Sequence, residues 1–139
     1  MKTLSQNPLL AQVELLSRQD TAALLPSRWM DQQKFSLTTG GFEEIMRETA
    51  AAFIEFMPGM LRDLKTAVDG KDVASTAKIL HKLKSSVSLL CTDAMSVEVI
   101  ELERSAANVD QSDFVIRINR LVLCIHHLVV DVMQFTRSY

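Results

Sequence analysis

Apolar residues recur at intervals of three and four along almost the whole chain, and no stretch alternates apolar and polar residues with a period of two. This spacing places apolar side chains on one face of a helix, whereas alternation indicates a strand. The segment 113–137 shows the pattern best. Its predicted core stripe is Ile118, Leu121, Ile125, Leu128 and Val132. We therefore expect an all-α fold, because four glycines and three prolines in 139 residues leave few interruptions.

The few helix-breaking residues divide the chain. The pair Gly40-Gly41 is the clearest internal break, and Pro58 should kink or restart the helix that contains it. Gly70 suits the left-handed position after a helix, and Asp72 can cap the next helix. Helices are expected at residues 42–68, 72–90, 93–107 and 113–137. Short turns between them predict an antiparallel up-down four-helix bundle over residues 41–139.

The last predicted helix is apolar on more than one face. Leu123, Val130 and Met133 form a flank beside the core stripe, and this flank needs a cover. We expect residues 1–40 to form an N-terminal helical extension, of one or two helices, that packs on the bundle. Its candidate covering residues are Leu9, Leu10, Val13, Leu16, Leu24, Leu25 and Trp29. A dimer contact through the same flank is the competing interpretation.

Composition and charge exclude several classes of protein. A net charge of -2 disfavours a general nucleic-acid or anionic-membrane binder. The most apolar run, residues 121–133, is shorter than the roughly 20 residues that span a bilayer, and the N-terminus lacks the apolar run of a signal peptide. Cys91 and Cys124 match no zinc spacing. We expect a cytoplasmic monomer with free thiols that binds neither nucleic acid nor membrane.

His81 lies within the predicted helix 72–90, and its helical surroundings indicate which way it points. Successive residues turn by about 100° around a helix. Within about 60° of His81 lie Ala74, Ala77, Lys78, Lys84, Ser85 and Ser88, whereas the far side collects Ile79, Leu80, Leu83, Val87 and Leu90. The spacing therefore predicts that His81 is at the centre of the solvent-facing side of its helix and is not a core residue.

The charges around His81 are of one sign. Lys78, Lys82 and Lys84 surround the imidazole, and no acidic residue stands three or four positions away. Cations favour the neutral, nucleophilic ring and stabilise an anion attached to it. The small neighbours Ala74, Ala77, Ser85 and Ser88 leave room for another protein's surface. This layout is typical of a histidine that receives a phosphoryl group. An incidental surface histidine is the alternative.

The same residues resemble a known family, the histidine-containing phosphotransfer (HPt) domains of bacterial two-component phosphorelays. The family pattern is approximately H-x-L-K-G-[SA]-[SA], followed by a helix that ends in L-E. The matching residues are His81, Leu83, Lys84 and Ser86, then Glu101, Leu102 and Glu103 downstream, and Phe53, Pro58, Leu61, Leu64, Ala67 and Gly70 upstream. The resemblance covers about residues 42–137. Ser85 and Cys91 stand where the family commonly has glycine.

The resemblance implies a phosphocarrier rather than a turnover enzyme. His81 is expected to accept a phosphoryl group from a receiver-domain aspartate and to pass it to another receiver, with Lys84 as a catalytic cation. The implied partner-binding residues are Lys78, Lys82, Ser85, Ser88, Ala77 and Ala74. No cofactor is expected on this chain, because the Mg²⁺ of such transfers belongs to the receiver domain.

Two other functions are compatible with parts of the sequence. The bundle could be an HPt-like adaptor that binds a receiver or kinase without carrying phosphate. Cys124, His127 and Asp131 share one helix face and could bind a transition metal. Di-metal bundles use Glu-x-x-His on two helices, however, and this motif is absent from the sequence. We therefore expect no metal and read these three residues as a solvated stripe. His126 is expected to pack beneath the N-terminal segment.

Overall fold

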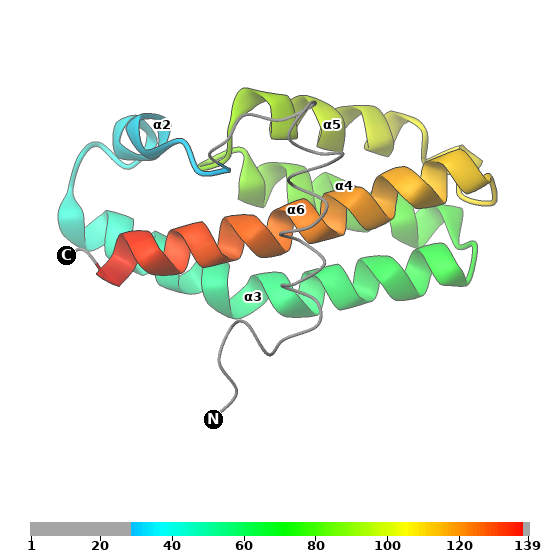
Figure 1. Ribbon diagram of the computed structural model, residues 1–139, viewed down its shortest axis with the longest axis horizontal. Coiled ribbons are helices and arrows are strands. Elements are labelled where there is room, and N and C mark those ends of the chain that lie inside the picture. Colours follow the sequence, from blue (N-terminus) through cyan, green and yellow to red (C-terminus); the bar gives the residue numbers. More distant parts are fainter. Residues whose placement is uncertain (1–28, 138–139) are drawn as a thin grey trace.

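The computed structural model describes residues 29–137 and confirms the all-α prediction for this part of the chain. Its helices are α2 (Gln32–Thr38), α3 (Glu43–Asp69), α4 (Val73–Val87), α5 (Asp93–Arg104) and α6 (Ser112–Arg137), with a 3₁₀ turn, η3 (Ala106–Asn108), before α6. Helices α3 to α6 run antiparallel to their neighbours and form the bundle, and α2 lies at one end (Figure 1). Residues 1–28 of the predicted N-terminal extension lie outside the described residues, so the division at residue 40 stays a prediction.

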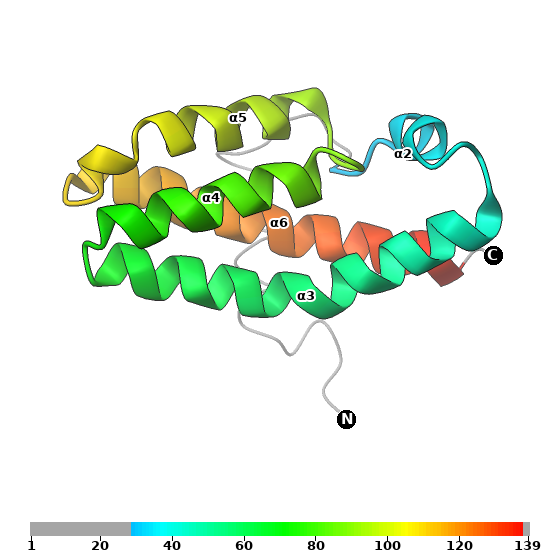
Figure 2. The same cartoon turned by 180° about the vertical axis from the view of Figure 1, so that it is seen from behind.

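Helix α3 continues through Pro58. Figure 2 shows that the helix changes direction part-way along its length instead of breaking, which is the expected effect of a proline that removes one backbone hydrogen bond. At its end, the prediction for Gly70 is wrong: its φ is -83°, and Lys71 takes the left-handed conformation at φ 55°. The helix extends to Asp69, so the left-handed residue that ends it falls one position later than predicted, at Lys71. The Lys71 and Asp72 N–H groups close it by donating to Val68 O and Ala67 O.

The core lies between α3, α4, α5 and α6. All five residues of the predicted α6 core stripe are buried, and so are Leu80, Leu83 and Val87 of α4. One residue of the predicted solvated stripe is also buried, because Cys124 is only 3% exposed. Helix α5 lies along this side of α6, as the hydrogen bond from Arg117 Nε to Glu98 Oε1 at 2.9 Å shows. The periodicity of α6 alone could not reveal that neighbour.

Residues 29–39 are tied to the bundle where α4 meets α5. The Asp31 N–H donates to Leu90 O and the Thr92 N–H donates to Trp29 O. Phe35 of α2 is buried and meets the ring of Phe135 edge-on, with 5.8 Å between ring centroids. This part of the chain therefore packs on the bundle. None of the described helices is long and apolar enough to cross a membrane.

Candidate functional site

The site is centred on His81, half-way along α4. Asp72 starts this helix by accepting the Ser75 N–H at 3.0 Å, as predicted, and the apolar face of α4 then turns Leu80 and Leu83 into the core. His81, on the opposite face, has a side chain that is 64% exposed. The helical spacing therefore placed this histidine correctly at the surface.

Helix α5 supplies an acidic partner that the local sequence around His81 lacks. His81 Nδ1 lies 2.9 Å from Glu103 Oε2, and Lys84 Nζ lies 3.0 Å from Glu103 Oε1. One carboxylate therefore joins the histidine to the lysine one turn further along α4. Hydrogen bonds from Lys84 and then from His81 hold the pKa of Glu103 below its ordinary value. The sequence-based view of His81 as surrounded only by cations is wrong, because antiparallel packing brings in a residue 22 positions away.

The carboxylate also selects the tautomer of the imidazole. An ionised carboxylate only accepts hydrogen bonds, so Nδ1 of His81 must carry the hydrogen that lies between the two groups. In the neutral ring, the second nitrogen, Nε2, then holds a lone pair. Because the ring is largely exposed, this nitrogen is available to a partner as a nucleophile. The geometry thus separates the two nitrogens into one that is anchored and one that can react.

The other predicted site residues lie on the same side of α4. Lys78, Lys82, Ala74 and Ser85 are exposed, and Ala77, Lys84 and Ser88 are half-buried. The two serine hydroxyls donate into their own helix, Ser85 Oγ to His81 O at 3.5 Å and Ser88 Oγ to Lys84 O at 2.5 Å. In this arrangement the serines offer small surface rather than free donors. Lys84 is engaged with Glu103, whereas Lys78 and Lys82 project from the helix surface.

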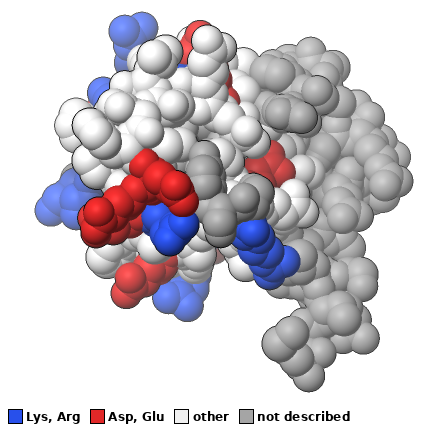
Figure 3. Space-filling model, turned by 90° about the vertical axis from the view of Figure 1, so that its left-hand side faces the viewer, with Lys and Arg blue, Asp and Glu red and all other residues white. Residues whose placement is uncertain are grey.

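A largely exposed, mainly apolar stripe along α3 adjoins this face, and it was not identified from the sequence. Its apolar members are Phe42, just before the helix, and Ile45, Ala52 and Phe56, and the half-buried Thr49 lies among them. They are spaced three and four residues apart, so this spacing was the available signal. Phe56 is 65% exposed, and a shallow groove of about 160 Å³ joins it to Met60 of α3 and to Leu89, just beyond α4. The stripe reaches the end of the bundle at which α3 begins, where Figure 3 shows uncharged surface beside a cluster of carboxylates around a basic group.

The residues considered for a metal have other contacts. His127 Nε2 lies 3.8 Å from Asp131 Oδ1, and Asp131 Oδ2 accepts the Trp29 N–H at 3.3 Å. The His127 ring lies 5.0 Å from the indole ring of Trp29. This pair therefore helps to hold Trp29 on α6. Among residues 29–137, no three His, Cys, Asp or Glu side chains are grouped so that they could hold a metal ion.

Comparisons with known proteins agree with this geometry. The fold is similar to the crystal structure of histidine-containing phosphotransfer protein B (HptB) from Pseudomonas aeruginosa PAO1, with a TM-score of 0.70, 17% identity, and coverage of 81% of this chain and 98% of that chain. At this identity the likeness concerns the fold. No curated protein sequence matches the chain. The sequence profile of the Hpt domain matches residues 48–129, which is more than half of the chain and includes His81, Lys84 and Glu103. The chain therefore belongs to the Hpt domain family, and its role is histidine phosphotransfer in a phosphorelay.

Proposed function

We propose that His81 accepts a phosphoryl group on Nε2 from the phosphorylated aspartate of one receiver domain and passes it to an aspartate of another. The observation that carries this proposal is the hydrogen bond between His81 Nδ1 and Glu103, combined with the exposure of the ring. An incidental surface histidine needs no carboxylate partner, whereas a nucleophilic histidine benefits from a hydrogen-bonded carboxylate that fixes both its tautomer and its orientation.

The chemical step balances without a further reagent. The Nε2 lone pair attacks the phosphorus, a P–N bond forms, and the P–O bond to the receiver's aspartate breaks with its electron pair leaving on that carboxylate. Nδ1 keeps its hydrogen, so the ring gains positive charge as the P–N bond forms. Glu103 Oε2 lies 2.9 Å from Nδ1 and stabilises the positive charge that develops on the ring. The reverse reaction on a second receiver returns His81 to its starting state.

Lys84 has an indirect part in this proposal. Its ammonium group is bound to Glu103 rather than directed freely at solvent, so it holds the carboxylate in place and keeps it ionised. Lys78 and Lys82 add positive field near the incoming phosphoryl oxygens. Phosphoryl transfer depends mainly on positioning and on charge neutralisation. We assign the Mg²⁺ that completes this neutralisation to the receiver domain.

The receiver is proposed to dock over His81 and toward α3. The side chains around the ring are small, so a partner surface can approach His81 closely; they are those of Ala74, Ala77, Ser85 and Ser88. On the α3 side, Phe56 and Leu89 expose apolar area that a partner could bury, and exposed apolar patches commonly mark such contacts. The docking surface would then combine a small-residue rim around the nucleophile with an apolar area further along α4.

The test is phosphotransfer from a radiolabelled receiver. The protein is incubated with every phosphorylated receiver domain of the source organism in turn, which also identifies donors and acceptors. The wild type should be labelled by its cognate receiver, His81→Gln should not, and His126→Gln on α6 is the matched control that should still be labelled. A Phe56→Asp variant should bind that receiver more weakly. Label that persists in His81→Gln would reject the assignment, and receiver binding without any label in the wild type would favour the adaptor.

A further inference from the structure

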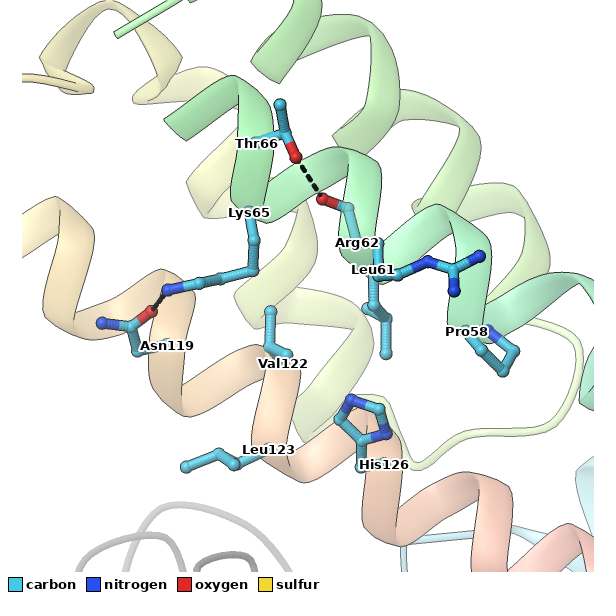
Figure 4. Close-up of a pocket in the computed structure, with 9 residues that line it drawn as sticks. All are labelled: Pro58, Leu61, Arg62, Lys65, Thr66, Asn119, Val122, Leu123 and His126. Carbon is cyan, nitrogen blue, oxygen red and sulfur yellow. Dashed lines mark hydrogen bonds between the residues drawn. The ribbon is translucent and has the colours of Figure 1, made fainter. Parts of the chain in front are cut away.

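A second groove lies on the other side of α3, between this helix and α6, and has a volume of about 840 Å³ (Figure 4). Leu61 of α3 and Val122 and His126 of α6 point into the space between the two helices. Basic groups border it: Arg62 is exposed, and Lys65 donates a hydrogen bond to Asn119 at one end. The groove is therefore apolar at its base and cationic along its α3 edge.

The described chain begins next to this groove. Trp29 is held on α6 by its N–H bond to Asp131 and by its ring contact with His127. His127 directly follows His126, which lines the groove. Trp29, the first described residue, therefore lies on the face of α6 that neighbours the groove.

The sequence of this segment fits such a surface. Leu9, Val13, Leu16 and Asp20 are spaced four, three and four residues apart, so a helix over residues 8–20 would present three apolar side chains and one carboxylate on one face. The apolar side chains match the base of the groove. The carboxylate at the end of that face matches the cations on its α3 edge.

We propose that residues 8–20 form an amphipathic helix that occupies the α3–α6 groove, with Asp20 near Arg62. The remaining residues 21–28 can span up to about 27 Å when extended, which exceeds the ~10–12 Å width of the α6 helix that they must cross. A tethered segment also has a high effective concentration, in the millimolar range for a short linker, which favours it over a separate partner. The groove lies away from His81, because α6 is diagonal to α4 in the bundle (Figures 1 and 2).

Histidine accessibility in the full-length protein tests this proposal. Diethyl pyrocarbonate acylates neutral imidazoles, and burial lowers the pKa of His126, which keeps it neutral. The labelling rate of each of the three histidines is measured by peptide mass spectrometry. In Val13→Asp, the His126 rate should rise several-fold over wild type, because a charge on the apolar face releases the helix. Ala11→Asp puts the same charge on the opposite face and should leave the rate unchanged.

The proposed contact between Asp20 and Arg62 is tested by exchanging charges. Arg62→Asp should raise the His126 labelling rate, and adding Asp20→Arg to it should restore the wild-type rate. Circular dichroism checks that each variant remains folded. Phosphorylation of His81 is measured in the same variants and should be unchanged, so that failure of the groove proposal can be distinguished from failure of the proposed phosphotransfer. An unchanged His126 rate in Val13→Asp, or an equal rise in Ala11→Asp, overturns the proposal. Protection of His126 that depends on protein concentration also overturns it, because a second copy then covers the groove.

Discussion

Replacement of Glu103 by glutamine is the sharpest test of the site, because it removes one negative charge and keeps the shape of the side chain. The carboxylate bridges His81 Nδ1 at 2.9 Å and Lys84 Nζ at 3.0 Å. The amide can present its NH₂ group to either partner, so the tautomer of His81 is no longer specified. We expect phosphoryl transfer to slow while the fold and the affinity for the receiver are retained.

The size of the effect follows from the exposure of the groups. Charge-assisted hydrogen bonds contribute about 1.5–3 kcal/mol when protected, and exposed ion pairs about 0.2–1 kcal/mol. The Glu103 side chain is 24% exposed and that of His81 is 64% exposed, so a value of about 1 kcal/mol is appropriate. Because each 1.36 kcal/mol changes a rate tenfold, about 1 kcal/mol corresponds to a transfer rate about fivefold lower.

The assay is single-turnover transfer from a phosphorylated receiver, followed by rapid quench, with receiver affinity measured separately by calorimetry. Glu101→Gln is the matched control: this residue lies two positions earlier on α5 and binds Arg117 of α6 at 3.1 Å instead. Its transfer rate should equal that of the wild type. A wild-type rate in Glu103→Gln would refute the orienting role of the carboxylate, and an equal slowing in both variants would point to a general effect on α5.

Four further predictions concern the same helix pair. Ser85→Arg should leave the circular dichroism spectrum unchanged and block receiver binding, since the site is exposed; wild-type transfer by this variant would exclude docking over this face. Lys84→Ala should slow transfer in the quench assay while calorimetric receiver affinity is kept. Asp72→Ala removes the α4 cap and should lower the free energy of unfolding, measured in urea, without changing the transfer rate. The pKa of Glu103 is lowered in the folded state, so the ionised carboxylate stabilises the fold above its ordinary pKa of 4.5, and this stabilisation is lost as the pH falls through the lower folded-state pKa. The difference in free energy of unfolding between wild type and Glu103→Gln should therefore shrink toward zero in acid. A difference that grows in acid would contradict the lowered pKa.

Much of the fold could be predicted from local sequence, because helix formation and helix ends depend on residues within a few positions of one another. The 3-4 spacing gave the core stripe of α6 and the exposed position of His81, and Asp72 was recognised as a cap from its place before an apolar run. The error at Gly70 was a shift of one residue, since the left-handed position belongs to Lys71. Such boundaries are set by the last hydrogen bonds of a helix, which sequence locates only approximately.

Contacts between helices were not predictable in the same way, because they depend on how neighbouring helices are rotated and offset against each other. Glu103 was recognised only as part of the end of its helix, yet the packing of α5 on α4 makes it the partner of His81. The burial of Cys124 likewise results from the neighbours that α6 acquires in the bundle. Periodicity along one helix was enough to place His81 at the surface, and the motif around it made it the candidate nucleophile. Only the tertiary structure decided which acid lies against it, since that requires the register between two helices whose paired residues are 22 positions apart.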